Sequence, residues 1–540
     1  MTWLAPVVLA GLVMLPRLAS PQFGFLDDGL TLETGRTVSG RWNAVLHLNP
    51  ETGRFVPAYW LVYSAIAMVG GVRPLAFFMF NAVILAALLA ILARLVRRSA
   101  ATRLQATIAM VLFAGCGPTI ESFYTLSKPE PLQLLWMAGA LLATAAAIDA
   151  TPGRRAGLIA LAASLSLFAY ATKETSVVLI PIALAWLAIE WARGGPRRFT
   201  VTYIAINVAA AVAFLVLRAH YAQLGLSEGS YTRAYTPEWR VMGPALFRIA
   251  AWLLRDFAFL LPLLVFVAVG RPRPRRGWSR PAWYAGAWMA GWLAVFLPWP
   301  ATFEYYLLPF AFGASAAAGM AAGAGWAARR RSQPAAGRRL AWSALVAAGL
   351  VWVMTVVNAG ADARVQLTVD RANAALVDFL AGLPAGSRVL LNTVMNEYHL
   401  ELPRHLVEIK GRPDIVVEPP RRAGSDAWPS ADLFVITAEL ANRPSPTVRL
   451  ALDEPGVARD RARLGRLLIG PSVPVYHEVL QARLVELGIH RWLCLVTVLP
   501  FIDPTFCPGD RPVLDRRLFT YGWQVHHLMR SPSSPERTRP

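Results

Sequence analysis

The sequence predicts a polytopic α-helical membrane protein with about eleven transmembrane helices and a C-terminal extracytoplasmic α/β domain. Two observations predict this fold class. Charged residues make up only 16% of the 540 residues, whereas a soluble protein of this size carries about a quarter. Long apolar runs recur through residues 1–358 and then stop, which is typical of a membrane domain followed by a soluble one.

The membrane domain is defined by its apolar segments, because a transmembrane helix needs about 20 such residues. Eleven segments qualify, at about 3–19, 74–95, 104–118, 131–149, 157–171, 175–192, 200–219, 246–269, 281–298, 305–326 and 341–358. The segment 57–71 is apolar but short and begins at Pro57, so we expect it to lie at the membrane interface. We expect segment 3–19 to be a retained span, since it lacks the basic start and cleavage site of a signal peptide.

The distribution of charge predicts the orientation. The net charge is +20, but the excess arginine lies in alternate short turns, as at Arg154 and Arg155, so we expect no nucleic-acid partner. The turns between these hold nearly all the acidic residues. The positive-inside rule then places the N-terminus in the cytoplasm and the C-terminus outside the cell membrane.

The region after the last apolar segment has a different pattern. Residues 364–383 have a helical pattern, and 387–393, 415–418 and 433–437 have the composition of strands. This alternation predicts a small α/β domain over 359–530. The tail 531–540 is rich in Pro, Ser and Arg and is predicted to be disordered.

The cysteines indicate no metal site. Cys116, Cys494 and Cys507 lack the spacing of metal ligands. A disulfide between Cys494 and Cys507 is chemically allowed outside the cytoplasm, and the sequence leaves it open.

Two adjacent carboxylates, Asp27 and Asp28, follow the first apolar segment and open an outer loop over 20–73. One of them can act as a general base while the other tunes it or binds a cation. Alternatively, Asp28 only caps a helix that begins near Gly29. A carboxylate pair can also hold a divalent cation, Mg²⁺ or Mn²⁺. That possibility stays open, and we assign no metal ligand and no certain cofactor.

Further ionic residues stand at the predicted outer ends of the spans, where charges near hydrocarbon are costly. Two of the three lysines stand beside glutamates there, Lys128 by Glu130 and Lys173 by Glu174. Each lysine either faces a phosphate or forms only an interfacial ion pair. The other candidates on this face are His47, Glu121, Arg218, Arg255, Glu304, Tyr305 and Tyr306. Tyrosines at this depth are more often interfacial belt residues, and Arg255 beside Asp256 can be an internal ion pair.

The order of these residues resembles that of the GT-C membrane glycosyltransferases, which include protein O-mannosyltransferases and lipid A aminoarabinose transferases. Five features carry the resemblance: Asp27-Asp28, the run Arg54-Phe-Val-Pro-Ala-Tyr-Trp60, Asn81, Glu121 followed by Ser127-Lys128-Pro-Glu130, and Thr172-Lys173-Glu174-Thr175. At the fourth feature, the mannosyltransferase-like members more often have an arginine and an aspartate. The resemblance covers about residues 1–310.

The resemblance implies inverting transfer of a sugar from a polyprenyl-phosphate donor at the outer face of the cytoplasmic membrane. The acceptor stays open between a cell-envelope glycan, a lipid and a protein. Asp27 or Asp28 would take the acceptor proton, and Arg54, Lys128 and Lys173 would bind the donor phosphate. The alternative is a transporter or flippase of a lipid-linked sugar, which predicts charges or broken helices at mid-membrane and often inverted repeats. The sequence shows no repeat, and its unusual charges lie mostly at the outer ends of the spans.

Overall fold

The computed structural model describes residues 4–47, 54–99, 101–126, 128–221, 235–270, 280–299, 303–329, 335–392, 396–418, 432–437, 468–480 and 519–529. The chain forms two compact units. The first, here called the helical unit, comprises Met1–Ala19 and Thr34–Ala363, and the second, the sheet unit, comprises Ser20–Glu33 and Arg364–Pro540. The predicted tail 531–540, Cys494 and Cys507 lie outside the described residues.

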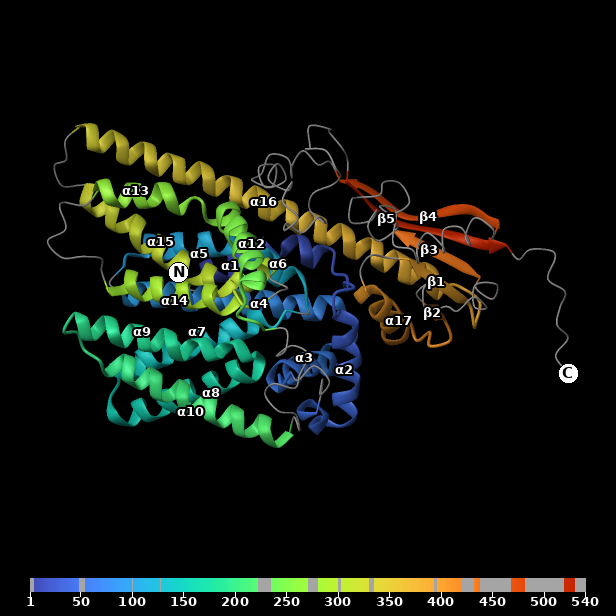
Figure 1. The fold of residues 1–540 in the computed structure, drawn as a ribbon, viewed down its shortest axis with the longest axis horizontal. Helices are drawn as coiled ribbons and strands as arrows, with labels where there is room; N and C mark the ends of the chain where they lie inside the picture. The colour runs from blue at the N-terminus through green and yellow to red at the C-terminus, as the bar shows by residue number, and fades with distance from the viewer. Residues whose placement is uncertain are drawn as a thin grey trace. The chain divides into compact units, whose positions relative to one another are not determined.

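The described part of the helical unit is made of helices (Figure 1). In chain order they are α1 (Leu4–Ala19), η1 (Trp42–Leu46), α3 (Pro57–Gly70), α4 (Pro74–Arg98), α5 (Arg103–Ala114), α6 (Gly117–Tyr124), α7 (Glu130–Ile148), α8 (Pro152–Thr172), η3 (Glu174–Val178), α9 (Leu179–Ala192), α10 (Arg198–Tyr221), α12 (Trp239–Phe257), α13 (Leu260–Gly270), α14 (Arg280–Phe296), η4 (Glu304–Leu307) and α15 (Leu308–Arg329). Two helices belong to both units: α2 (Asp28–Gly40) and α16 (Ala335–Ala381).

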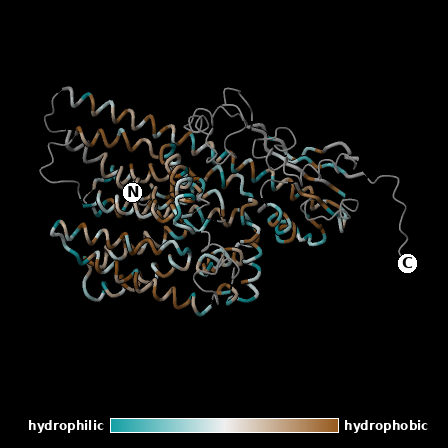
Figure 2. Tube along the Cα trace, viewed as in Figure 1, coloured by the Kyte–Doolittle hydropathy of each residue, from teal (hydrophilic) through white to brown (hydrophobic). Residues whose placement is uncertain are grey.

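Seven helices in the described ranges are long and apolar enough to cross a membrane, or nine if each of two bent pairs counts as one span. Many apolar side chains on them face outward, such as Val216, 63% exposed on α10, and Leu350, 64% exposed on α16. Figure 2 shows how hydrophobic residues run along these helices. Outward apolar side chains suit lipid, and the chain is a multi-pass membrane protein.

Each of the eleven predicted segments contains a helix. The count of eleven spans stays a prediction, because α1 has 16 residues and α14 has 17, fewer than the about 20 that a span needs. A helix is present at the predicted position 57–71 as α3, which begins at Pro57, and its place at the membrane interface stays a prediction.

Two predicted spans are bent rather than straight. α5 and α6 meet at 60°, where Gly115 ends α5 and Pro118 lies in the first turn of α6. α12 and α13 meet at 64°, with Pro262 at the start of α13. Proline lacks the N–H that a continuing helix requires, which explains both breaks. In contrast, the predicted separate helix at 364–383 is part of the continuous, 47-residue α16.

The sheet unit contains a five-stranded sheet in the order β2-β1-β3-β5-β4, together with helix α17 (Asn396–Lys410). The strands are β1 (Arg388–Asn392), β2 (Val416–Glu418), β3 (Leu433–Thr437), β4 (Leu468–Leu480) and β5 (Phe519–Met529). β1 pairs in parallel with β2 and β3, whereas β5 is antiparallel to β3 and β4. Strands β1 to β3 coincide with the three predicted strands, and β4 and β5 were not predicted.

The core of the sheet unit includes a residue from the distant N-terminal segment. Phe25 is 1% exposed and packs edge-on against Tyr398 at 5.3 Å and His405 at 4.9 Å between ring centroids. Trp523 of β5 lies 6.4 Å from the Phe25 ring, and its indole N–H donates to Asn373 of α16 at 3.2 Å. Burying a phenylalanine contributes about 2–3 kcal/mol, so Phe25 anchors the segment that carries Asp27 and Asp28.

Candidate active site

A cluster of ionic side chains in the helical unit is built from α6, α7, α12, α16, η3, η4 and the turns beside them. We call it the ionic cluster; it comprises Glu121, Lys128, Glu130, Lys173, Arg255, Asp256, Glu304 and Asp362. Lys173 ends α8 and forms an ion pair with Glu130, the first residue of α7. Their side chains are 10% and 0% exposed. The N-terminus of a helix favours a carboxylate, which helps to place Glu130 there.

The ion pairs differ from those that the sequence suggested. Lys173 pairs with Glu130 instead of its neighbour Glu174. The Glu174 carboxylate accepts a hydrogen bond from the backbone N–H of Phe55 at 3.0 Å. Glu174 therefore connects the Arg54–Trp60 run to η3, and Arg54, which is half-buried, lies close to the charge of Lys173.

Both lysines of the cluster lie over tyrosine rings. The Lys128 ammonium is 4.2 Å from the Tyr305 ring centre, and the Lys173 ammonium is 4.3 Å from that of Tyr306. The two tyrosine rings are 4.4 Å apart and each residue is 9% exposed, so they are buried rather than set out in an interfacial belt. Aromatic faces attract cations, and this pair of rings holds the two ammonium groups close together.

Arg255 connects three elements of the helical unit. One guanidinium nitrogen donates to Glu304 of η4 at 2.6 Å, and another forms an ion pair with Asp362 of α16. The suggested pair of Arg255 with Asp256 is not what the structure shows, because Asp256 accepts a hydrogen bond from the Gly117 N–H at 3.1 Å. Sequence reasoning did not find Asp362, which follows the last predicted span and has no motif around it.

The ionic cluster contains five carboxylates and three cationic side chains. Four carboxylate oxygens are buried without a hydrogen-bond partner among the described residues: Glu121 Oε2, Glu130 Oε2, Asp256 Oδ2 and Glu304 Oε1. Glu121 also lies close to the charges of Lys128 and Arg255. Buried acceptors normally find donors, so these oxygens are suited to accept hydroxyl groups from a ligand.

His47 and Arg218 have different surroundings. His47 is exposed at the end of η1, and its ring lies 5.9 Å from that of Tyr221 on α10. Arg218, also on α10, is only 4% exposed. Within the described part of the chain, its Nε and Nη2 atoms have no hydrogen-bond partner. A buried guanidinium of this kind is suited to an anion.

The predicted acidic pair belongs to the sheet unit. Asp28 is the first residue of α2, whereas the capping hypothesis had the helix begin near Gly29. Its buried carboxylate accepts from the Gly24 N–H at 2.7 Å and so closes the turn before the helix. Asp27 is exposed and has a φ of 63°. This left-handed conformation is unfavourable for a residue with a side chain, and such residues concentrate at functional sites. Asp27 is thus the more accessible of the two carboxylates.

Across the ranges that the structure describes, no group of three or more His, Cys, Asp or Glu side chains is arranged to hold a metal ion. Cys116 is a buried free thiol.

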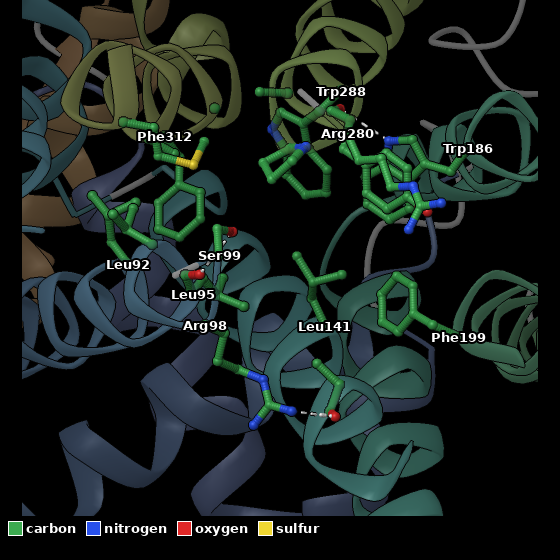
Figure 3. A pocket seen from close by; sticks show the side chains of 18 of the residues that line it. Leu92, Leu95, Arg98, Ser99, Leu141, Trp186, Phe199, Arg280, Trp288 and Phe312 are labelled. Atoms are coloured by element: carbon green, nitrogen blue, oxygen red, sulfur yellow. Dashed lines mark hydrogen bonds between the residues drawn. The ribbon is translucent and has the colours of Figure 1, made fainter. Parts of the chain in front are cut away.

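A cavity of about 400 Å³ lies among α4, α7, α9, α10, α14 and α15 and shares no residue with the ionic cluster. Its walls are mostly apolar, and Figure 3 shows Leu92, Phe199, Trp288 and Phe312 around it. Two arginines at its edge are already occupied, because Arg98 pairs with Asp149 and Arg280 faces Glu190 at 3.5 Å. The cavity therefore differs in chemistry from the ionic cluster.

Comparison with solved structures identifies membrane proteins that share the fold of this chain. The chain is similar to ArnT from Cupriavidus metallidurans bound to undecaprenyl phosphate, with 15% identity and a TM-score of 0.52 over 83% of this chain and 94% of that one. ArnT from the same organism in the apo state gives 14% identity and a TM-score of 0.53 over 87% of this chain and 95% of that one. The apo oligosaccharyltransferase of Archaeoglobus fulgidus gives 11% identity and a TM-score of 0.53 over 97% of this chain and 88% of that one.

These proteins have the GT-C fold, and the present chain has it as well, as its sequence resemblance implied. No protein-family model matches the sequence, and no curated protein matches it. At these low identities the structural similarity establishes the fold.

Proposed function

We propose that the protein is a membrane glycosyltransferase that transfers a sugar from a polyprenyl-phosphate donor to an acceptor hydroxyl, with inversion at the anomeric carbon. The observation that carries this proposal is the pair of ammonium groups, Lys128 and Lys173, held over Tyr305 and Tyr306 in a GT-C fold. Support also comes from ArnT, which has this fold and was crystallised with undecaprenyl phosphate.

The proposed role of the cations follows from the leaving group. When the bond between the anomeric carbon and the phosphate oxygen breaks, negative charge grows on the lipid phosphate. Lys128, Lys173 and Arg54 stabilise that charge, and losing one such contact commonly costs about 3 kcal/mol of transition-state stabilisation. A phosphate already leaves readily, so the reaction needs no acid catalyst.

The acceptor hydroxyl must lose its proton as it attacks the sugar, and we assign this step to Asp27. Its carboxylate is exposed, whereas that of Asp28 is buried and accepts from Gly24. Inversion requires the acceptor to approach from the side opposite the leaving phosphate. The unpartnered oxygens of Glu121 and Glu304 are suited to hold the hydroxyls of the transferred sugar.

We place this reaction at the outer face of the cytoplasmic membrane. The arginine-rich turns, such as that with Arg154 and Arg155, support a cytoplasmic location for the opposite face. The sheet unit and the acceptor, which is a cell-envelope glycan, a lipid or a protein, are then extracytoplasmic. A reporter enzyme active only outside the cytoplasm, fused after residue 540, should be active in cells.

The direct test is turnover in detergent. Purified protein is mixed with undecaprenyl-phosphate sugars that differ in the sugar, and with a membrane extract as the source of acceptor. We expect release of undecaprenyl phosphate with at least one donor, and a loss of about 100-fold in Lys173→Met. Lys410→Met is the matched control, because Lys410 pairs with Asp378 in the sheet unit, outside the ionic cluster.

One observation favours the transporter or flippase as a second candidate. Arg255 and Asp256 of the ionic cluster stand just before the break between α12 and α13, and Asp256 accepts from the N–H of Gly117 at the break between α5 and α6. Broken helices often build transport sites. Detergent separates the two functions, because a transporter without a membrane cannot release undecaprenyl phosphate from its sugar. Absence of release with every donor, together with donor movement in sealed vesicles, would favour the transporter.

A further inference from the structure

Helix α17 of the sheet unit holds the segment that carries Asp27. The Gly29 backbone N–H donates to Glu401 Oε2 at 2.6 Å. Arg404, one turn further along α17, donates to Glu401 Oε1 at 2.9 Å and to Glu33 Oε2 at 2.8 Å. Glu401 thus binds Gly29 at one end of the 29–33 segment, and Arg404 binds Glu33 at the other end. A third hydrogen bond joins Arg404 to Glu401.

The fit leaves no room for a side chain at Gly29. A Cβ atom there would lie 2.8 Å from Glu401 Oε2 and 2.9 Å from His405 Nδ1. On the other side of Asp27, Phe25 is buried in the core, and the Gly24 N–H is bound by Asp28. The backbone is therefore fixed immediately before and after Asp27.

Fixed flanks explain how Asp27 keeps its left-handed conformation. Such a conformation persists only where the surrounding structure imposes it. Glu401 and Arg404 impose it from one side, and Phe25 does so from the other. The backbone next to Asp27 is thus held by contacts between residues 371 and 372 positions apart in the sequence.

We infer that Glu401 and Arg404 are positioning residues, which hold the backbone at 29–33 so that Asp27 presents its carboxylate to the acceptor. This inference rests on the proposed function. It gives the sheet unit a role in the chemistry itself, besides any role in choosing the acceptor. Neither residue touches the reacting atoms, so both act through Asp27.

The anchor should respond to pH near neutrality. The charged and titratable groups around Glu401 are Arg404, His405, Asp27 and Glu33. Burial raises the pKa of Glu401 to about 7, against the opposing effects of Arg404 and the Gly29 N–H. Protonation takes one acceptor oxygen from a carboxylate that now accepts from two donors, so the anchor weakens as the pH falls below about 7.

The test compares Glu401→Gln, Asp27→Asn and the control Glu408→Gln, which lies on the same helix two turns further on. Turnover is measured in detergent with the undecaprenyl-phosphate sugar that the wild type uses. For Glu401→Gln we expect kcat to fall by about 10- to 100-fold with an unchanged KM for the donor. The decline of wild-type kcat below pH 7 should be absent from this variant. Glu408→Gln should behave as the wild type.

Arg404→Lys provides a second test that does not depend on Glu401→Gln folding. Lysine keeps the charge but cannot bind two carboxylates as a planar guanidinium does. We expect a smaller loss of kcat, again with an unchanged KM.

Each failure has its own signature. The inference would be overturned if Asp27→Asn is inactive while Glu401→Gln keeps the wild-type kcat and pH profile. If Glu401→Gln does not fold, Arg404→Lys takes its place in this comparison. Either result would leave the proposed function intact. A fully active Asp27→Asn would instead contradict the assignment of the base.

Discussion

The Lys173 ammonium and the Glu130 carboxylate form a buried ion pair that joins the end of α8 to the start of α7. Lys173 is 8% exposed and Glu130 is fully buried. Charges this close to hydrocarbon are costly unless they are paired. The pair therefore keeps a buried cation in the helical unit, over the Tyr306 ring.

Removing one partner of this pair should destabilise the fold. In Lys173→Met the Glu130 charge remains buried without compensation, and we expect a loss of about 3–5 kcal/mol in the free energy of unfolding. In the double variant Lys173→Met/Glu130→Gln no charge remains, and most of the stability should return. Thermal unfolding in detergent measures both.

Turnover should not return with stability in that double variant, because the proposed cation for the phosphate is still missing. Recovery of turnover along with stability would mean that Lys173 serves only to neutralise Glu130.

Arg255 should tolerate lysine poorly. Arg255 is 2% exposed, and its guanidinium contacts both Glu304 and Asp362. A lysine ammonium cannot reproduce this planar geometry. We expect Arg255→Lys to lower the free energy of unfolding by about 1–3 kcal/mol, and Arg255→Met to lower it more. Equal stability of Arg255→Lys and the wild type in thermal unfolding would contradict the bridging role.

The sequence predicted the helical framework well, because a lipid-facing helix must be apolar along its length. It did not predict the breaks. The pattern at 104–118 and 246–269 is continuously apolar, and only the glycine and proline residues Gly115, Pro118 and Pro262 indicate a bend. β4 was missed because its two prolines and one glycine reduce strand propensity. The sheet accommodates them with register shifts near Ile469 and Val475.

The candidate site was predicted in part. Ionic residues near the ends of apolar segments gave Lys128, Lys173, Arg255 and Glu304, which the structure brings into one cluster. Closeness in the sequence did not predict which residues form ion pairs, because Glu130 at the start of α7 pairs with Lys173 at the end of α8. Glu401 and Arg404 carried no signal, because their partners lie near the N-terminus and only folding brings the two segments together.

Substitution of Arg218 should show whether this buried cation binds an anionic ligand. The guanidinium is 4% exposed, and two of its nitrogens have no hydrogen-bond partner in the described part of the chain. We expect Arg218→Met to weaken binding of undecaprenyl phosphate by about 10-fold or more. The free energy of unfolding should stay the same or rise, because an uncompensated buried charge is removed. Unchanged affinity in a lipid-binding titration would show that Arg218 has no part in anion binding.

Glu401 and His405 should have opposite effects on stability against pH. Burial lowers the pKa of His405 from 6.5 to about 4, so the folded state loses stability as the pH falls through this range. The pKa of Glu401 is raised from 4.5 to about 7, so the folded state gains stability as the pH falls from 7 to 4.5. The two effects nearly cancel in the wild type.

Glu401→Gln removes the compensating effect. Between pH 6.5 and 4 this variant should lose about 3 kcal/mol of stability relative to the wild type, since one pKa unit corresponds to about 1.4 kcal/mol. His405→Gln keeps only the Glu401 effect and should gain stability over the same range. Thermal unfolding at several pH values measures this, and parallel pH curves for Glu401→Gln and the wild type would rule the mechanism out.

The central proposal is that the protein releases a sugar from a polyprenyl-phosphate donor, with a carboxylate of the Asp27–Asp28 pair taking the proton of the acceptor. The most direct measurement compares release of undecaprenyl phosphate by the wild type and by the double variant Asp27→Asn/Asp28→Asn in detergent, with binding of undecaprenyl phosphate measured on both. We predict that the double variant loses at least about 100-fold in turnover and still binds the lipid. Turnover by the double variant at the wild-type rate would contradict the account.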